Sequence, residues 1–228
     1  MAELLSDLKQ PIAILPEYIA STPTTLHVKQ HRHPKNKPFH HSTGMAICRW
    51  PENGSFRSQE GRGLFTVTNE STISDFRRHF FSSAGTPLFE ISKKIGSVTF
   101  FVLPPGKGRK GVSRSALEAE SLAVIATRWD SIRYKFDLYV KNGAGDGTGD
   151  GYGNEKEVKL EVRGQDKIRS RTNVYFKGRV VMVAFRVDAY ASTTEMEWKV
   201  EVAKGLAISL ASAIMPVLGM MLSGTGAR

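Results

Sequence analysis

The feature that most constrains this fold is a stretch of eighteen uncharged residues near the C-terminus, residues 205–222. At helical spacing its large apolar residues form two stripes, one through Leu210 and Ile214 and another through Met215 and Leu218. A helix formed here would therefore be apolar on every side. Such a helix is stable only when protein surrounds it or when it lies in a bilayer.

Both interpretations fit the length of the stretch, since about 20 residues cross a bilayer. Two serines, a proline and a glycine interrupt the stretch, and only one basic residue, Arg228, follows it. An alternating segment that ends at Val202 comes almost directly before it. These features favour a helix buried in protein over a transmembrane anchor.

The preceding sequence alternates between polar and apolar residues in short segments, most clearly at 135–140 and 156–162. Alternation is typical of antiparallel strands with one face in water, and many short strands are typical of a barrel or sandwich. A capping box from Ser115 to Glu118 predicts a short helix over 115–126. The expected strands are 66–69, 98–103, 124–129, 135–140, 158–162, 173–176, 180–187 and 197–202.

The composition favours an anionic partner in a reducing compartment. The chain has 32 Lys and Arg against 22 Asp and Glu, a net charge of +10, so nucleic acid, acidic protein and anionic membranes are the candidate classes. The single cysteine, Cys48, excludes an internal disulfide and a cysteine-built zinc site. Residues 1–20 do not resemble a secretory signal. We therefore expect a cytoplasmic protein, peripheral at membranes.

Three segments resemble a known superfamily over residues 11–223. Trp198-Lys-Val-Glu-Val-Ala-Lys-Gly205, followed by Leu-Ala-Ile-Ser-Leu-Ala, is similar to the closing strand and central helix of the tubby C-terminal-like superfamily, closest to the LURP-one-related proteins. The sequence Pro-Glu-Tyr-Ile-Ala from Pro16 resembles the family's first segment, and Ser-Ala-Gly-Thr-Pro-Leu-Phe from Ser83 resembles its repeated hairpin. The sequence Trp-Pro-Glu-Asn-Gly from Trp50 departs from the family's Asp-x-x-Gly turn.

This resemblance implies a mainly β fold: a closed barrel of about twelve antiparallel strands around a hydrophobic helix at 205–222. One domain would span 11–223, with tails at 1–10 and 224–228. Closure removes exposed sheet edges, and the helix would fill the interior.

The superfamily includes phosphoinositide-binding tubby domains and phospholipid scramblases. The resemblance thus implies a non-catalytic domain that binds anionic phospholipid, with a phosphoinositide-like head group, at a membrane surface. Two alternatives stay open: scramblase-like lipid translocation through the C-terminal helix, and a protein-interaction scaffold without a ligand. Nucleic-acid binding rests on charge alone and is the least favoured.

Basic residues cluster at 93–114, with no acid between them, and at 163–179, with Asp166 as the only acid. The glycine-rich segment 106–111 could direct backbone N–H groups and cations toward one phosphate. The alternative is a solvated basic surface without a ligand. Antiparallel strands oppose a dinucleotide site in this G-x-G-x-x-G sequence. The candidate lipid-binding residues are Lys93, Lys94, Lys107, Arg109, Lys110, Arg114, Lys167, Arg169 and Arg171.

No cofactor or confident metal site is expected. Asp146, Asp150 and Glu157 follow EF-hand spacing, but Thr148 and Gly153 depart from it, which favours a glycine-rich hairpin tip over a calcium site. A Lys- and Pro-rich segment contains five histidines, expected to be solvated: His27, His31, His33, His40 and His41. There is no nucleophile elbow and no histidine evident beside Cys48 in the sequence, so we do not expect an enzyme.

Overall fold

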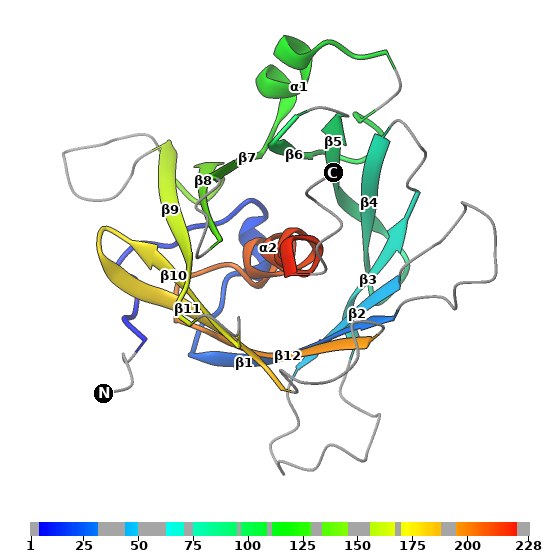
Figure 1. Ribbon diagram of the computed structural model, residues 1–228. Coiled ribbons are helices and arrows are strands. Elements are labelled where there is room, and N and C mark those ends of the chain that lie inside the picture. The colour runs from blue at the N-terminus through cyan, green and yellow to red at the C-terminus, as the bar shows by residue number, and fades with distance from the viewer. Residues whose placement is uncertain are drawn as a thin grey trace.

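The computed structural model describes residues 5–31, 44–49, 63–70, 75–94, 97–108, 111–128, 134–145, 156–166, 170–187 and 195–222. Within these ranges, twelve antiparallel strands form one closed barrel in which β1 pairs with both β2 and β12 (Figure 1). This confirms the predicted fold. The strands are β1 (Thr24–His31), β2 (Gly44–Arg49), β3 (Gly63–Asn69), β4 (Asp75–Ser82), β5 (Pro87–Lys94), β6 (Thr99–Leu103), β7 (Ala123–Arg128), β8 (Lys135–Lys141), β9 (Glu157–Gly164), β10 (Arg171–Phe176), β11 (Arg179–Arg186) and β12 (Glu195–Val202).

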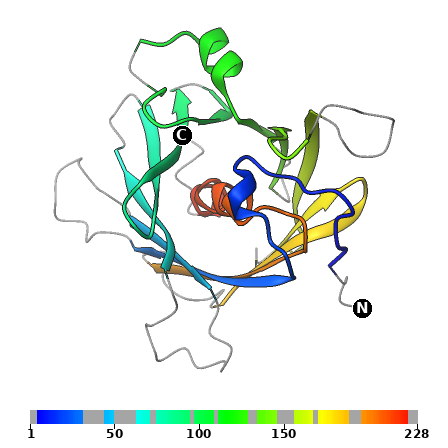
Figure 2. The same cartoon turned by 180° about the vertical axis from the view of Figure 1, so that it is seen from behind.

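Helix α2 (Ile208–Leu222) lies in the middle of the barrel, with strands around it in both views (Figures 1 and 2). Its residues 208–219 are all buried. The interpretation as a helix enclosed by protein is therefore correct. No helix in the described ranges is long and apolar enough to cross a membrane.

The helix begins three residues later than the sequence predicted. Gly205 has a φ of +88°, and a Cβ at this position would lie 2.8 Å from the Cβ of Leu8. Leu206 and Ala207 then form isolated bridges with Ile12 and Ile19. The chain thus turns from β12 into the barrel before it becomes helical.

Period-2 alternation sorts the side chains between the interior and the outer face. In β9, Val158, Leu160 and Val162 are buried, while Lys159 and Arg163 are exposed. The eight strands expected from alternation are all present. Strands β1, β2, β4 and β5 were not predicted, although β2 buries every second residue in the same way. In β4 a charged residue, Arg78, takes a buried position at only 4 % exposure.

Strand β6 is buried on both faces because a short helix covers its outer side. Helix α1 (Arg114–Glu120) packs Leu117 against Phe101 and Leu103, outside the main barrel core. The predicted helix over 115–126 was wrong at both ends. The N-cap is Ser113, which accepts a hydrogen bond from the Ala116 N–H at 3.2 Å. The residues from Ala123 onward form β7, because Val124, Ile125 and Thr127 are β-branched and the segment pairs with β6.

The N-terminal segment closes one end of the barrel, where Figure 2 shows it lying across the start of α2. The Asn142 side chain holds it in place: Oδ1 accepts from the Ala13 N–H at 3.0 Å, and Nδ2 donates to the Pro11 carbonyl at 3.1 Å. Within the segment expected as a tail, the Leu8 N–H donates to the Lys204 carbonyl at 2.9 Å. The short helix η1 (Pro16–Tyr18) follows.

Truncating Ile214 to alanine should lower the free energy of unfolding by about 2–5 kcal/mol, because it leaves a cavity in the tightly packed interior. Ile214 is fully buried in the middle of α2. The matched control is Val98→Ala, since Val98 is 46 % exposed and its truncation should change stability by less than about 0.5 kcal/mol. Urea unfolding checks both, and equal effects would contradict the enclosed helix.

Candidate functional site

The glycine-rich segment lies over the outer face of β5, where a buried carboxylate occupies one of its backbone amides. The Gly108 N–H donates a hydrogen bond to Oε1 of Glu90, which is 1 % exposed. A Cβ on residue 108 would lie 2.6 Å from the same oxygen, so glycine is required for this approach. The second Glu90 oxygen lies 3.3 Å from Nδ1 of His79, whose Nε2 lies 3.2 Å from Glu70. This amide therefore already binds an anion of the protein itself.

The described cations of this segment are also compensated. Lys107 lies 3.4 Å from Glu120, and the Nε of Arg114 lies 3.0 Å from Glu118. Both carboxylates belong to α1, and they reduce the local excess of positive charge seen in the sequence. Arg109 and Lys110 lie outside the described residues.

Lys93 lies apart from these residues, on the inner side of β5 with Phe89 and Ile91. Its ammonium nitrogen lies 5.2 Å from the centre of the Phe100 ring. Burial lowers the pKa of Lys93. The side chain of Lys94 lies outside the described residues. Of the described candidates of the 93–114 cluster, Lys93 therefore lies apart from Lys107 and Arg114.

Arg171 is the described member of the second candidate group, and it lies on β10. Its Nε donates to Oδ1 of Asn173 at 3.1 Å, and its guanidinium lies 5.4 Å from the centre of the Phe185 ring. Lys167 and Arg169 lie outside the described residues. The Arg171 guanidinium therefore contacts neutral groups, while the Arg171 backbone N–H donates to Oδ2 of Asp166 at 3.1 Å.

Sequence analysis missed a row of three cations on the outer face of β7, β8 and β9. Arg128 stands directly opposite Lys135, and Lys135 directly opposite Arg163. Neighbouring strands lie about 4.8 Å apart, so the three side chains start close together although they are distant in the sequence. We call these three residues the cationic row. Like charges in direct register repel each other, so nearby carboxylates are needed to offset the charge of the row.

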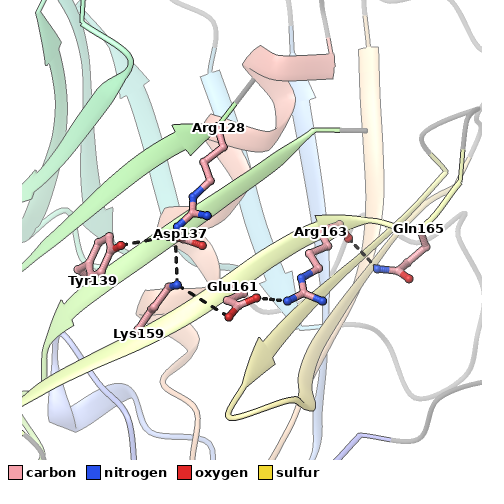
Figure 3. A network of polar contacts seen from close by, with 7 residues as sticks. All are labelled: Arg128, Asp137, Tyr139, Lys159, Glu161, Arg163 and Gln165. Carbon is pink, nitrogen blue, oxygen red and sulfur yellow. Dashed lines mark hydrogen bonds and ion pairs between the residues drawn. The ribbon is translucent and has the colours of Figure 1, made fainter. Parts of the chain in front are cut away.

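That compensation comes from two carboxylates in the next row of the same face, Asp137 and Glu161, which also stand opposite each other. Arg128 pairs with Asp137, and Arg163 pairs with Glu161 (Figure 3). Lys159 lies between the acids, 3.3 Å from Asp137 and 3.8 Å from Glu161. Asp137 is only 1 % exposed, so the basic side chains cover it.

These ion pairs shift the pKa values of Arg128 and Glu161 in the directions that favour their charged forms. The charge of Asp137 raises the pKa of Arg128. The hydrogen bond from Arg163, more than any other interaction, lowers the pKa of Glu161, and the charges of Arg163, Lys159 and Lys135 lower it further. Lys135 itself has no carboxylate within ion-pair distance among the described residues.

The surface as a whole remains positive. Four basic side chains surround two carboxylates: Arg128, Lys135, Lys159 and Arg163 against Asp137 and Glu161. Arg171 lies on the adjoining strand β10, next to Asp166. Arg163 also lies 5.1 Å from the centre of the Tyr175 ring. This arrangement can attract and hydrogen-bond an anion, since charge-assisted hydrogen bonds are the strong ones.

Few of the metal candidates from the sequence have side chains within the described residues. In the described ranges no group of three or more His, Cys, Asp or Glu could hold a metal. Of the calcium candidates, Glu157 stands opposite Lys141 at the start of β9, while Asp146 and Asp150 lie outside these ranges. His27 pairs with Glu197 at 2.5 Å. The side chains of His31, His33, His40 and His41 lie outside the described residues.

Cys48 stands opposite His27 on β2, a pairing that sequence analysis missed because the two residues are separated along the chain. Burial raises the pKa of the Cys48 thiol. The thiol therefore stays protonated at neutral pH, whereas a nucleophilic cysteine needs a thiolate.

The comparisons with known proteins agree with this architecture. A family model described as LURP-one-related matches residues 50–219. The crystal structure of an Arabidopsis thaliana protein superimposes with a TM-score of 0.54 at 14 % identity, covering 92 % of this chain and 98 % of that one. A LolA superfamily protein from Nitrosomonas europaea reaches a TM-score of only 0.21 at 9 % identity, over 84 % of this chain and 92 % of its own. No curated protein matches the sequence significantly.

Replacing Glu90 with alanine should lower the free energy of unfolding by about 1–3 kcal/mol, because the Gly108 N–H and His79 lose a buried acceptor. The matched control is Glu118→Ala, which breaks the exposed pair with Arg114 and should cost less than about 1 kcal/mol. Urea unfolding measures both variants. An equal, small effect would show that the glycine-rich segment does not depend on Glu90.

Glu161 should make the stability of the barrel sensitive to acid. Its pKa lies below the ordinary 4.5, so its ionised form stabilises the fold above that pH, and this stabilisation is lost as the pH falls through the lowered pKa. Glu161→Gln should therefore reduce the fall in Tm between about pH 5 and pH 3. Thermal melts across that range check this, with Glu157→Gln as the control; identical profiles for E161Q and the unmodified protein would contradict it.

Proposed function

This chain belongs to the LURP-one-related family, and we propose that its barrel binds anionic phospholipid at a membrane surface through the cationic row and Arg171. The observation that carries the proposal is the alignment of Arg128, Lys135 and Arg163 across three strands of a rigid barrel. Basic side chains near an anionic leaflet each contribute about 1 kcal/mol of attraction. A phosphoinositide-like head group falls within the class of ligands proposed.

The chemistry of these side chains suits a phosphate. Arginine presents a planar fork of N–H donors and binds phosphate oxygens in pairs, while lysine acts as a point charge. Tyr139 lies on the same face beside Asp137 and is 45 % exposed. Its amphipathic ring is suited to the boundary between lipid head groups and water.

The proposed association is peripheral and non-catalytic, on the cytoplasmic side of a membrane. Lipid translocation by α2 would require the helix to leave the barrel. That would expose the interior faces of the strands and forfeit the burial of residues 208–219, a loss larger than the roughly 5–15 kcal/mol that stabilises a typical domain. Peripheral binding therefore fits the structure better than a scramblase-like mechanism.

The experiment neutralises Lys135 and Arg171, whose side chains pair with no carboxylate of the described residues, so that no described ion pair is broken. The double variant Lys135→Gln, Arg171→Gln should lose about 2 kcal/mol of attraction to anionic vesicles, which is roughly 30-fold in apparent affinity. The matched control is Lys107→Gln, Arg114→Gln, which removes the same charge from the glycine-rich segment and α1. Co-sedimentation with phosphatidylserine vesicles at low salt measures both.

The binding should also weaken steeply with added salt, because the Debye length shrinks to about 8 Å at physiological ionic strength. Equal losses in the two double variants would indicate a diffuse basic surface without a defined site. A chain that binds no anionic vesicle at low salt would refute the lipid proposal and favour a protein-interaction scaffold.

A further inference from the structure

We propose that the cationic row selects a phosphate monoester, a terminal phosphate seated between Arg128, Lys135 and Arg163. This inference rests on the proposed function, because it names the chemical group that the same surface binds. It goes further in separating lipids whose phosphate is a monoester from those whose phosphate is a diester.

The number of donors favours the monoester. The row offers three cationic side chains from three adjacent strands, about 4.8 Å apart at the backbone. A phosphate monoester has three terminal oxygens that accept strong hydrogen bonds. Each oxygen can therefore take a different member of the row, whereas a diester has two free oxygens and leaves one member without a contact.

The charge of the surface points the same way. The four basic side chains around Asp137 and Glu161 exceed these two carboxylates by two positive charges. A monoester carries about −1.5 to −2 at neutral pH, against a single negative charge for a diester. The monoester therefore balances more of the excess.

The two acids orient the row without blocking it. Asp137 lies beneath Arg128 and Lys159 and is 1 % exposed, so a ligand meets the cations and not the carboxylate (Figure 3). Glu161 is held by Arg163. Among the described residues, no carboxylate pairs with Lys135, in the middle of the row, so its charge is the one that a ligand can use in full.

The test compares two vesicle compositions at matched surface charge, phosphatidic acid for the monoester and phosphatidylglycerol for the diester, both in phosphatidylcholine. The unmodified protein should bind phosphatidic acid vesicles at least about tenfold more tightly. Lys135→Gln should abolish most of this preference, and Lys135→Arg should retain it because it keeps the charge. Lys107→Gln is the control and should leave the preference intact.

A soluble competitor distinguishes the two sources of the monoester. Displacement from phosphatidic acid vesicles by millimolar glycerol 3-phosphate, but not by sodium chloride of equal ionic strength, would support recognition of the phosphate alone. If the protein instead stays bound to phosphatidic acid vesicles in the presence of glycerol 3-phosphate, and Lys135→Gln still loses the preference for phosphatidic acid, the phosphate is recognised as part of the lipid surface.

Two results would overturn the inference, and they differ in what they mean for the proposed function. Equal affinity for the two vesicles at matched charge would refute monoester selection while the proposed lipid binding stands. Absence of binding to both vesicles would refute the proposed function and this inference together. Thermal melts of each variant confirm that the barrel is intact.

Discussion

The burial of α2 is the interaction on which the rest of the structure depends. A helix that is apolar on every side needs a complete apolar surround, and a barrel closed by the pairing of β1 with β12 provides one. The fit is close: a Cβ on Gly219 would lie 2.5 Å from Gln30 and 3.4 Å from Trp198. At the other end, Asn142 fastens the N-terminal segment across the start of the helix. Residues from both ends of the chain therefore complete one core.

Because α2 fills the interior of the barrel, the proposed ligand would bind to the outer face. Most inward positions of the strands are apolar and belong to the core around α2. Most charged residues therefore occupy the outward positions, where alternation places them in rows across the barrel. Arg128, Lys135 and Arg163 form one such row, and Asp137 and Glu161 stand in the next row. The closed backbone holds these rows in register, which positions several cations for one ligand without a pocket in the interior.

The two basic regions of the chain illustrate how folding changes electrostatics. The glycine-rich segment is uniformly basic in the sequence, yet Glu90 holds the Gly108 amide, and Glu118 and Glu120 from α1 pair with its described cations. In contrast, Arg128 and Lys135 lie outside both basic clusters of the sequence and join Arg163, from the cluster at 163–179, only through strand pairing. Local charge density along a chain therefore says little about the potential at the folded surface.

The sequence by itself determined the enclosed helix, the strand-rich fold and eight of the strands, because hydrophobic periodicity is a local property. The LURP-one-related resemblance, carried by the residues around Trp198 and Gly205, supplied the closed topology. Only the tertiary structure decided the candidate site and the exact start of α2. Lys135 meets Arg128 and Arg163 through strand register, and register depends on how the whole barrel closes around its helix. Local spacing in the sequence does not show this register, because it arises from contacts between residues that are far apart along the chain.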